Sequence, residues 1–286
     1  MAVTVYTLAS FAKTGNGGNP AGVVLAADDL EETKMLRIAR IVGFSETAFV
    51  QKSDKADYRV RFFTPKVEVD LCGHATIATF ALLRRKGIIG DGMFSQETKA
   101  GILTVRVEDD LVFMNQTLPK YYDLVDKTEI ADSLSILPHD CPQNLPAQIV
   151  STGLRDILLP VNDIHAMYSM KPDMKKIAAL SKKYDVVGIH AFCLEAKYGG
   201  TAQCRNFAPL YGIDEEAATG TSNGALACYL YHCGALNHET PGELIFEQGY
   251  SMGKPSEILV RLRVAGGTIH EVLVGGRAIV GDELEV

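Results

Sequence analysis

The chain has 286 residues, with 28 Lys and Arg against 35 Asp and Glu, so its formal net charge is −7 at pH 7. Hydrophobic residues make up 47% and charged residues 22%, which is typical of a globular protein and excludes intrinsic disorder. The acidic balance and the absence of any Lys/Arg run longer than three residues argue against binding to nucleic acid or to an anionic membrane. This length predicts two domains of about 140 residues each.

The first residues and the cysteines indicate the compartment. Residues 1–8 alternate polar and apolar side chains with no basic stretch before them, so we predict a first strand and no signal peptide. No stretch approaches the ~18 apolar residues of a membrane helix. The cysteines form no C-x-x-C pair, and none has a histidine at a spacing typical of zinc sites: Cys72, Cys141, Cys193, Cys204, Cys228 and Cys233. We therefore expect a cytoplasmic protein with free thiols and without metal-dependent chemistry.

The two halves of the chain carry the same series of motifs. The pattern R-x-F-x-P occurs at residues 61–65 and again at 205–209. After a short acidic loop, a turn of small residues opens an apolar segment in each half. Aligned without gaps, four positions of these segments match: Gly73 with Gly220, Ala78 with Ala225, Leu83 with Leu230, and Gly87 with Gly234. The series predicts a duplicated domain of strand, loop and helix.

The predicted helices over residues 75–83 and 224–230 are apolar on almost every side, so each has to be buried all round. Each ends at a C-cap glycine, Gly87 or Gly234. Around them we predict short strands at 58–63, 101–107, 111–115, 147–151, 157–161, 258–264 and 270–274, with amphipathic helices at 31–42 and 175–184.

These elements predict an α+β fold of two domains, each a mostly antiparallel strand roll around a central helix. We place the N-terminal domain at residues 1–118 and the C-terminal domain at 124–274. Residues 275–286 are assigned to neither domain, because the sequence does not decide whether they cross back to the first one.

The two glycine turns are candidate anion sites. Backbone N–H groups at a helix N-terminus are unpaired and carry the positive end of the helix dipole, so they can hold a carboxylate or stabilise a developing oxyanion. The alternative is that Gly73 and Gly220 only permit tight packing. The spacing is not that of a nucleotide-binding glycine loop.

Two side chains are candidates for proton transfer. Cys72, at a helix N-terminus, would have a lowered pKa, but the equivalent residue of the other half is Thr219, which argues against a two-thiol epimerase. Glu46 interrupts an apolar segment. If the two halves of the chain are aligned so that Ala48-Phe49 matches Ala191-Phe192, Glu46 lies on an insertion that the second half lacks. In a closed apolar cleft its carboxyl would have a raised pKa suited to proton transfer; a solvated loop carboxylate is the alternative.

Two further features have both a functional and a structural interpretation. His74 follows Gly73 on the same turn and could position or relay a proton, although a lone histidine is more often structural. The acidic run at 214–216 is typical of a solvated face or of a charge complement to the following helix.

The ordered set of motifs resembles the PhzF family of phenazine biosynthesis-like proteins and, more distantly, the diaminopimelate epimerase fold. The segments that carry the resemblance run through nearly the whole chain: G-N-P-A-G-V at 18–23, G-F-S-E-T-A-F at 43–49, R-F-F-T-P at 61–65, D-L-C-G-H-A-T at 70–76, R-N-F-A-P at 205–209, E-A-A-T-G-T at 216–221, E-Q-G at 247–249 and M-G-K-P-S at 252–256.

The resemblance implies two pseudo-symmetric domains with the active site in the cleft between them, a homodimer, and no cofactor. Glu46 falls on the family's catalytic carboxylate, which shuttles a proton between two carbons of one substrate. Family members of phenazine synthesis isomerise trans-2,3-dihydro-3-hydroxyanthranilate. The substrate-binding residues implied in this way are Asn19, Ser45, Gly73, His74, Glu216, Gly220 and Thr221.

One position departs from the family pattern. Where the family has E-D-P-x-T-G-S, this chain has Glu216 in place of the aspartate and Ala217 in place of the proline. An added methylene moves a carboxylate by roughly 1 Å, a displacement that can cost about 10²-fold in rate.

We therefore expect a cofactor-independent isomerase of a small carboxylated metabolite, with Glu46 as its proton shuttle. One alternative is an amino-acid epimerase or racemase that uses Cys72. Another is a non-catalytic small-molecule-binding or scaffold protein of the same fold.

Overall fold

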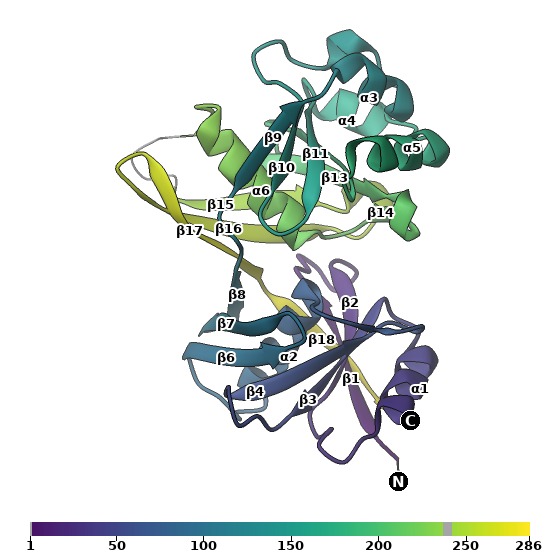
Figure 1. Cartoon of the computed structure of the whole chain (residues 1–286), viewed down its shortest axis with the longest axis vertical. Helices are drawn as coiled ribbons and strands as arrows, with labels where there is room; N and C mark the ends of the chain where they lie inside the picture. The colour runs from purple at the N-terminus through teal and green to yellow at the C-terminus, as the bar shows by residue number, and fades with distance from the viewer. Residues whose placement is uncertain (1, 237–241) are drawn as a thin grey trace. The chain divides into compact units, whose positions relative to one another are not determined.

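The computed structural model describes residues 2–236 and 242–286. The chain forms two compact units: unit 1 comprises the residues up to Asn115 together with Gly275–Val286, and unit 2 comprises Gln116–Val274 (Figure 1). No helix in the described part of the chain is long and apolar enough to cross a membrane.

In unit 1 the strands pair in the order β18, β1, β2, β3, β4, β6, β7, β8, and β5 pairs with β4. Neighbours are antiparallel except β2–β3 and β4–β6, which are parallel. The strands are β1 (Thr4–Ser10), β2 (Asn19–Val24), β3 (Glu46–Gln51), β4 (Tyr58–Phe63), β5 (Glu68–Val69), β6 (Gly92–Thr98), β7 (Gly101–Glu108), β8 (Leu111–Asn115) and β18 (Ala278–Glu285). Helix α1 (Glu32–Val42) connects the first parallel pair, and α2 (Gly73–Arg85) precedes β6.

Unit 2 repeats this arrangement. Its strands pair in the order β9, β10, β11, β12, β13, β15, β16, with β14 on β13, and again two pairs, β11–β12 and β13–β15, are parallel. The strands are β9 (Lys120–Leu124), β10 (Gln148–Ser151), β11 (Arg155–Pro160), β12 (Gly188–Cys193), β13 (Ala202–Ala208), β14 (Ile213–Glu216), β15 (Glu243–Gln248) and β16 (Ser256–Ala265), followed by β17 (Thr268–Gly276). The repeated pairing confirms the predicted duplication.

The helices of unit 2 are α3 (Lys127–Leu134), α4 (Ile164–Ser169), α5 (Met174–Tyr184) and α6 (Gly220–His232). Three short 3₁₀ helices cover Pro138–Asp140, Pro209–Tyr211 and Tyr250–Met252. Along the chain, helices α4 and α5 connect the parallel strands β11 and β12, as α1 connects β2 and β3. Likewise, α6 precedes β15 as α2 precedes β6. The fold is therefore α+β, as predicted.

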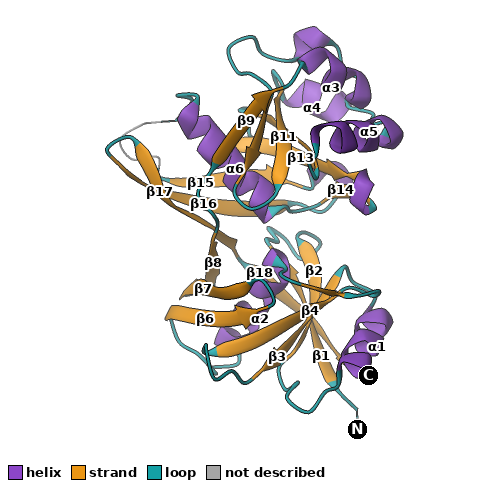
Figure 2. Ribbon diagram, viewed as in Figure 1, coloured by secondary structure: helices purple, strands orange, loops and turns teal. Residues whose placement is uncertain are grey.

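Side chains of β3 alternate between two cores, one on each face of the sheet of unit 1. Figure 2 shows the ribbons of β3 and of helices α1 and α2, which contribute to these cores. Ala48 and Val50 pack in the core that contains Ala75, Ala78 and Leu82 of α2. Phe49, between them, packs in the core that contains Met35 and Ile38 of α1. Because successive strand residues point to opposite faces, Glu46 shares the α2 face with Ala48 and Val50.

Helices α2 and α6 are the predicted buried helices. Each has 13 residues, and α6 is buried from Ser222 to Tyr231. The chain leaves each helix through a glycine in the left-handed region, Gly87 at φ 70° and Gly234 at φ 71°. The N–H groups of Ile88 and Ala235 then bond back to carbonyls in the last helical turn. Both glycine ends are confirmed.

The R-x-F-x-P motif has the same structural role in both units. Arg61 forms a 2.7 Å ion pair with Glu68 and lies over the ring of Phe63. Arg205 likewise pairs with Glu215 at 2.8 Å and lies over Phe207. The expectation of a solvated acidic run is therefore wrong for Glu215, because a buried arginine on the neighbouring strand β13 binds its carboxylate.

The strand registers correct one part of the predicted repeat alignment. Phe49 lies opposite Arg61 on β4, and Ala191 lies opposite Arg205 on β13. Matching the two arginines therefore pairs Phe49 with Ala191, and the alignment of Ala48-Phe49 with Ala191-Phe192 is wrong by one residue. In this register Glu46 corresponds to Gly188, so Glu46 does not lie on an insertion.

Candidate active site

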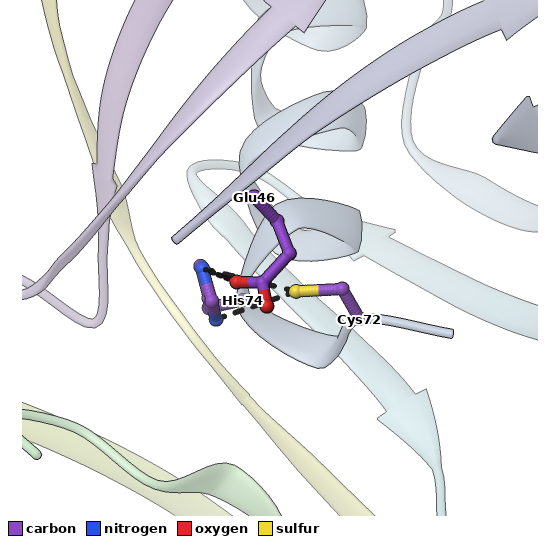
Figure 3. Close-up of side chains that lie close together, drawn as sticks. All are labelled: Glu46, Cys72 and His74. Carbon is purple, nitrogen blue, oxygen red and sulfur yellow. Dashed lines mark hydrogen bonds and ion pairs between the residues drawn. The ribbon is translucent and has the colours of Figure 1, made fainter. Parts of the chain in front are cut away.

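Glu46 is the first residue of β3, and strand alternation directs its side chain toward the beginning of α2. Its Oε2 atom lies 3.2 Å from Nε2 of His74, the second residue of α2 (Figure 3). The Glu46 side chain is 20% exposed and that of His74 is 10% exposed. The carboxylate is thus held in place but still reachable from solvent.

Three more side chains surround the imidazole of His74. The sulfur of Cys72 lies 3.4 Å from Nδ1 and 3.7 Å from Nε2. The hydroxyl of Ser45 lies 3.3 Å from Nε2, and the amide nitrogen of Asn19 lies 3.4 Å from Nδ1. Unit 1 therefore brings together Glu46, the additional candidate Cys72, and the predicted substrate-binding residues Asn19, Ser45 and His74, which come from β2, the start of β3 and the start of α2.

The surroundings of Glu46 are polar, and this reverses the predicted direction of its pKa. Burial raises the pKa of the carboxyl, but the hydrogen bond and charge of His74 lower it, as do hydrogen bonds from Ser45 and Cys72. The net pKa lies below the usual value for glutamate, so the prediction of a raised pKa is wrong. The carboxylate is ionised at neutral pH and available as a proton acceptor.

The predicted low pKa of Cys72 is also wrong. Burial raises the pKa of this thiol and outweighs its hydrogen bond with His74. Burial by itself would lower the pKa of His74, but the interactions with Cys72 and Glu46 raise it well above the usual value for histidine. At neutral pH these directions favour an ionised Glu46 and an uncharged Cys72 thiol, and the charge of Glu46 favours the protonated form of His74.

Gly73 is the first residue of α2, so the predicted turn is a helix N-terminus. A Cβ atom built at Gly73 would meet no atom within 4 Å. Tight packing within the described residues therefore does not explain this glycine, and the first turn of α2 is open beside Glu46 and His74. The hydroxyl of Ser10 donates a 2.6 Å hydrogen bond to the carbonyl oxygen of His74 and holds this turn.

The other predicted substrate-binding residues lie at the start of α6 in unit 2. Gly220 is the first residue of that helix, Thr221 the second, and Glu216 ends β14. The hydroxyl of Thr219 donates a 2.6 Å hydrogen bond to the Glu216 carboxylate. Gln248 donates to the Thr219 hydroxyl at 3.0 Å and to the Glu216 carbonyl at 2.8 Å. Contact of these residues with a substrate stays a prediction.

A buried polar network continues beneath the first turn of α6, and sequence reasoning missed it. The amide of Asn223 donates to Gln248, and its oxygen lies 3.3 Å from Nε2 of His190. His190 is fully buried, and its Nδ1 atom lies 3.2 Å from the Asn206 amide. A polar residue in an otherwise apolar strand was the signal that could have identified it.

The network ends at a second buried carboxyl group. Asn206 donates to the Ser222 hydroxyl at 3.2 Å, and Ser222 donates to Asp156 at 2.6 Å. Asp156 is 2% exposed, and burial raises its pKa to about 7, with the charge of Glu216 adding to the shift and the Ser222 hydrogen bond opposing it.

The family model of phenazine biosynthesis-like proteins matches residues 8–283. The chain belongs to the PhzF family. Among its relatives in this family, the uncharacterised isomerase YfhB of Bacillus subtilis is 34% identical over 274 residues, which cover 93% of this chain and 92% of YfhB.

Two further PhzF-family proteins are similar over the whole chain. The trans-2,3-dihydro-3-hydroxyanthranilate isomerase of Pseudomonas chlororaphis is 31% identical over 277 residues, which cover 94% of each chain. The crystal structure of a Bacillus anthracis PhzF-family phenazine biosynthesis protein has a TM-score of 0.91 at 35% identity and covers 100% of this chain and 99% of its own. The chain is a PhzF-family isomerase.

Proposed function

We propose that the protein isomerises a small carboxylated metabolite by moving a proton between two of its carbons through Glu46. The ionised carboxylate takes a proton from a carbon that a neighbouring unsaturated or carboxyl group makes acidic. The protonated Glu46, which is 20% exposed and exchanges its proton with solvent, then protonates a second carbon of the resulting anion. The observation that carries this proposal is the position of the Glu46 carboxylate, which solvent can reach. It lies 3.2 Å from His74, and His74 belongs to the open first turn of α2.

The electrostatics of the site support an anionic substrate. The positive charge of His74 balances the charge of Glu46, and the neutral thiol of Cys72 adds none. The N-terminal end of α2 contributes a further partial positive charge. A substrate carboxylate next to Gly73 therefore meets a favourable potential, and the anion formed after proton removal is stabilised by the same groups.

We propose trans-2,3-dihydro-3-hydroxyanthranilate as the first substrate to test, because the Pseudomonas chlororaphis relative carries the name of that isomerase. The position of Glu216 bears on this choice. Its longer side chain is held by the Thr219 hydroxyl at 2.6 Å. A related carboxylated substrate of different length is the alternative within the same mechanism.

The geometry disfavours thiol-based epimerisation, whereas a binding role is separated from catalysis by experiment. Thiol-based epimerisation needs an ionised cysteine, whereas burial raises the pKa of Cys72, and the equivalent helix-capping residue in unit 2 is Thr219. A binding protein that has lost its chemistry would keep the fold but would exchange no protons between ligand and solvent. Proton exchange therefore separates the enzyme from the binding protein.

The test is incorporation of solvent deuterium, followed by NMR of trans-2,3-dihydro-3-hydroxyanthranilate in D₂O. We expect wild-type protein to introduce deuterium at carbon and Glu46→Gln to lower the rate by about 10²-fold or more, the range for loss of a general base. Glu31→Gln is the matched control, because Glu31 is exposed and its side chain makes no capping hydrogen bond. Unchanged exchange in Glu46→Gln would contradict the role of this carboxylate. Absence of exchange with wild type would contradict the substrate, and Glu216→Asp would then be tested on it.

A further inference from the structure

Glu46, Cys72 and His74 bring three different metal-binding atoms together. A carboxylate oxygen, a thiol sulfur and an imidazole nitrogen all lie within 4.8 Å of one another. Among residues 2–236 and 242–286, it is the only group of three or more potential metal-binding side chains whose ligand atoms lie this close together. Figure 3 shows the three side chains converging from the start of β3 and the start of α2.

Two of the three spacings are close to those around one tetrahedral ion. With typical zinc distances to N, O and S, a tetrahedral ion places nitrogen and oxygen ligands about 3.4 Å apart, and it places sulfur about 3.6 Å from either of them. In the structure, Nε2 of His74 lies 3.2 Å from Oε2 of Glu46 and 3.7 Å from the sulfur of Cys72. The carboxylate oxygen and the sulfur lie within 4.8 Å of each other, so side-chain shifts of up to about 1 Å would complete the geometry.

We propose that Glu46, Cys72 and His74 form a binding site for Zn²⁺ and chemically similar divalent ions, and that a bound ion inhibits the isomerase. Three protein ligands leave a fourth position for water or for a substrate oxygen, as in zinc sites that are not purely structural. Inhibition follows because Glu46 cannot accept a proton while its oxygen binds the metal. The inhibitory part rests on the proposed function, whereas the binding part does not.

The donor set selects the class of ion. Thiolate and imidazole are preferred by Zn²⁺ and other late first-row ions, while Mg²⁺ and Ca²⁺ prefer oxygen ligands alone. The thiolate and carboxylate together neutralise a divalent charge, and metal binding releases the proton of the thiol and the second ring proton of His74. The exposed fractions of Glu46 and His74, 20% and 10%, leave a route for the ion.

Cobalt provides a direct readout, because Co²⁺ replaces Zn²⁺ and absorbs visible light when it is tetrahedral. We titrate the chelator-treated full-length protein with Co²⁺ and expect a thiolate-to-cobalt charge-transfer band that saturates at one equivalent. Cys72→Ser should abolish the band, and His74→Gln should weaken binding by at least tenfold. Cys233→Ser is the control, because Cys233 is half-buried in unit 2 and outside the cluster; it should keep the band.

A charge-transfer band that persists in Cys72→Ser, or the absence of any such band in wild type, would overturn the site. If Cys72→Ser does not fold, the wild-type protein supplies the test. Zn²⁺ should slow alkylation of Cys72 by iodoacetamide at least tenfold, measured by peptide mass spectrometry. Equal alkylation rates with and without Zn²⁺ would overturn the proposal.

Inhibition is measured separately. One equivalent of Zn²⁺ should lower wild-type deuterium exchange at least tenfold, and EDTA should restore it. If cobalt and zinc bind without an effect on deuterium exchange, the proposed inhibition is wrong, whereas the proposed metal-binding site stands. A failure of the proposed function is recognisable in another way, because the protein would then bind Co²⁺ through Cys72 but catalyse no exchange in the absence of metal.

Discussion

At the scale of single residues, two buried carboxyl groups respond differently to their surroundings. Burial raises the pKa of both Glu46 and Asp156. The hydrogen bond and charge of His74, together with hydrogen bonds from Ser45 and Cys72, more than offset this effect at Glu46, so that group stays ionised. Asp156 has a hydroxyl, Ser222, in place of a cation, and its pKa rises to about 7. The type of hydrogen-bonding partner therefore decides which carboxyl group can act as a base at neutral pH.

The raised pKa of Asp156 predicts a pH-dependent stability. Between about pH 4 and pH 7 the folded protein binds a proton at Asp156 that the unfolded chain has lost, so the unfolding free energy falls as pH rises through this window. A shift of about three pKa units corresponds to roughly 4 kcal/mol at most. Asp156→Asn should remove this contribution, so the variant should gain stability over wild type as the pH rises.

Urea unfolding of wild type and Asp156→Asn at a series of pH values measures this difference. Asp29→Asn, at an exposed position of unit 1, is the control and should follow wild type throughout. A pH dependence that is the same in wild type and Asp156→Asn would show that Asp156 has no elevated pKa.

At the scale of elements, β3 and β12 are equivalent strands with different first residues. Gly188 stands where β3 has Glu46, and a Cβ atom at Gly188 would lie 1.9 Å from the carbonyl oxygen of Phe207. Close approach of β13 thus leaves no room for a side chain in unit 2. The chemistry-bearing carboxylate occurs once in the molecule for a steric reason, even though the strand pairing occurs twice.

Gly188 and Gly73 should respond differently to substitution by alanine. Gly188→Ala should destabilise the protein by roughly 3 kcal/mol, the upper range for overpacking, because backbone has to move. Gly73→Ala should change stability by less than about 1 kcal/mol, since its Cβ meets no atom within 4 Å. Thermal and urea unfolding measure both. If Gly73 contacts substrate, Gly73→Ala should still reduce deuterium exchange, and equal destabilisation by the two variants would contradict the steric argument.

At the scale of the whole molecule, the two units are built differently from the chain. Unit 2 is one continuous segment with its own core of strand and helix residues. Unit 1 needs the C-terminal strand β18, which pairs with β1 and places Ala278 and Val280 against the core that contains Leu8. The chain must return from unit 2 before the sheet of unit 1 is complete.

This arrangement predicts different behaviour of two fragments. A fragment of residues 116–274 should unfold cooperatively and show dispersed amide NMR signals. A fragment of residues 1–115 should not, because β1 would expose an unpaired edge and part of its core. Addition of a peptide of residues 275–286 should restore order to the second fragment. Cooperative folding of residues 1–115 without that peptide would contradict the requirement for β18.

Much of this molecule could be predicted from local patterns. The apolar helices end at Gly87 and Gly234 as predicted, because the backbone of a helix end depends on the residues beside it. The match of Arg61 with Arg205 correctly indicated a duplication, since a repeated fold repeats its anchoring contacts. Glu46 and His74 lie together as the family motifs implied, although their proposed roles await the exchange experiment.

The properties that the sequence did not reveal depend on partners far along the chain. Ser222 and Asp156 are 66 residues apart, and Glu46 and His74 are 28 apart. No local pattern states which of these groups meet, and therefore none gives the sign of a pKa shift. The sequence by itself determined the elements, the duplication and the family. Only the tertiary structure decided that Glu46 is ionised, that Cys72 is a buried thiol beside His74, and that Gly188 excludes a second carboxylate, because burial and electrostatic interactions act through space.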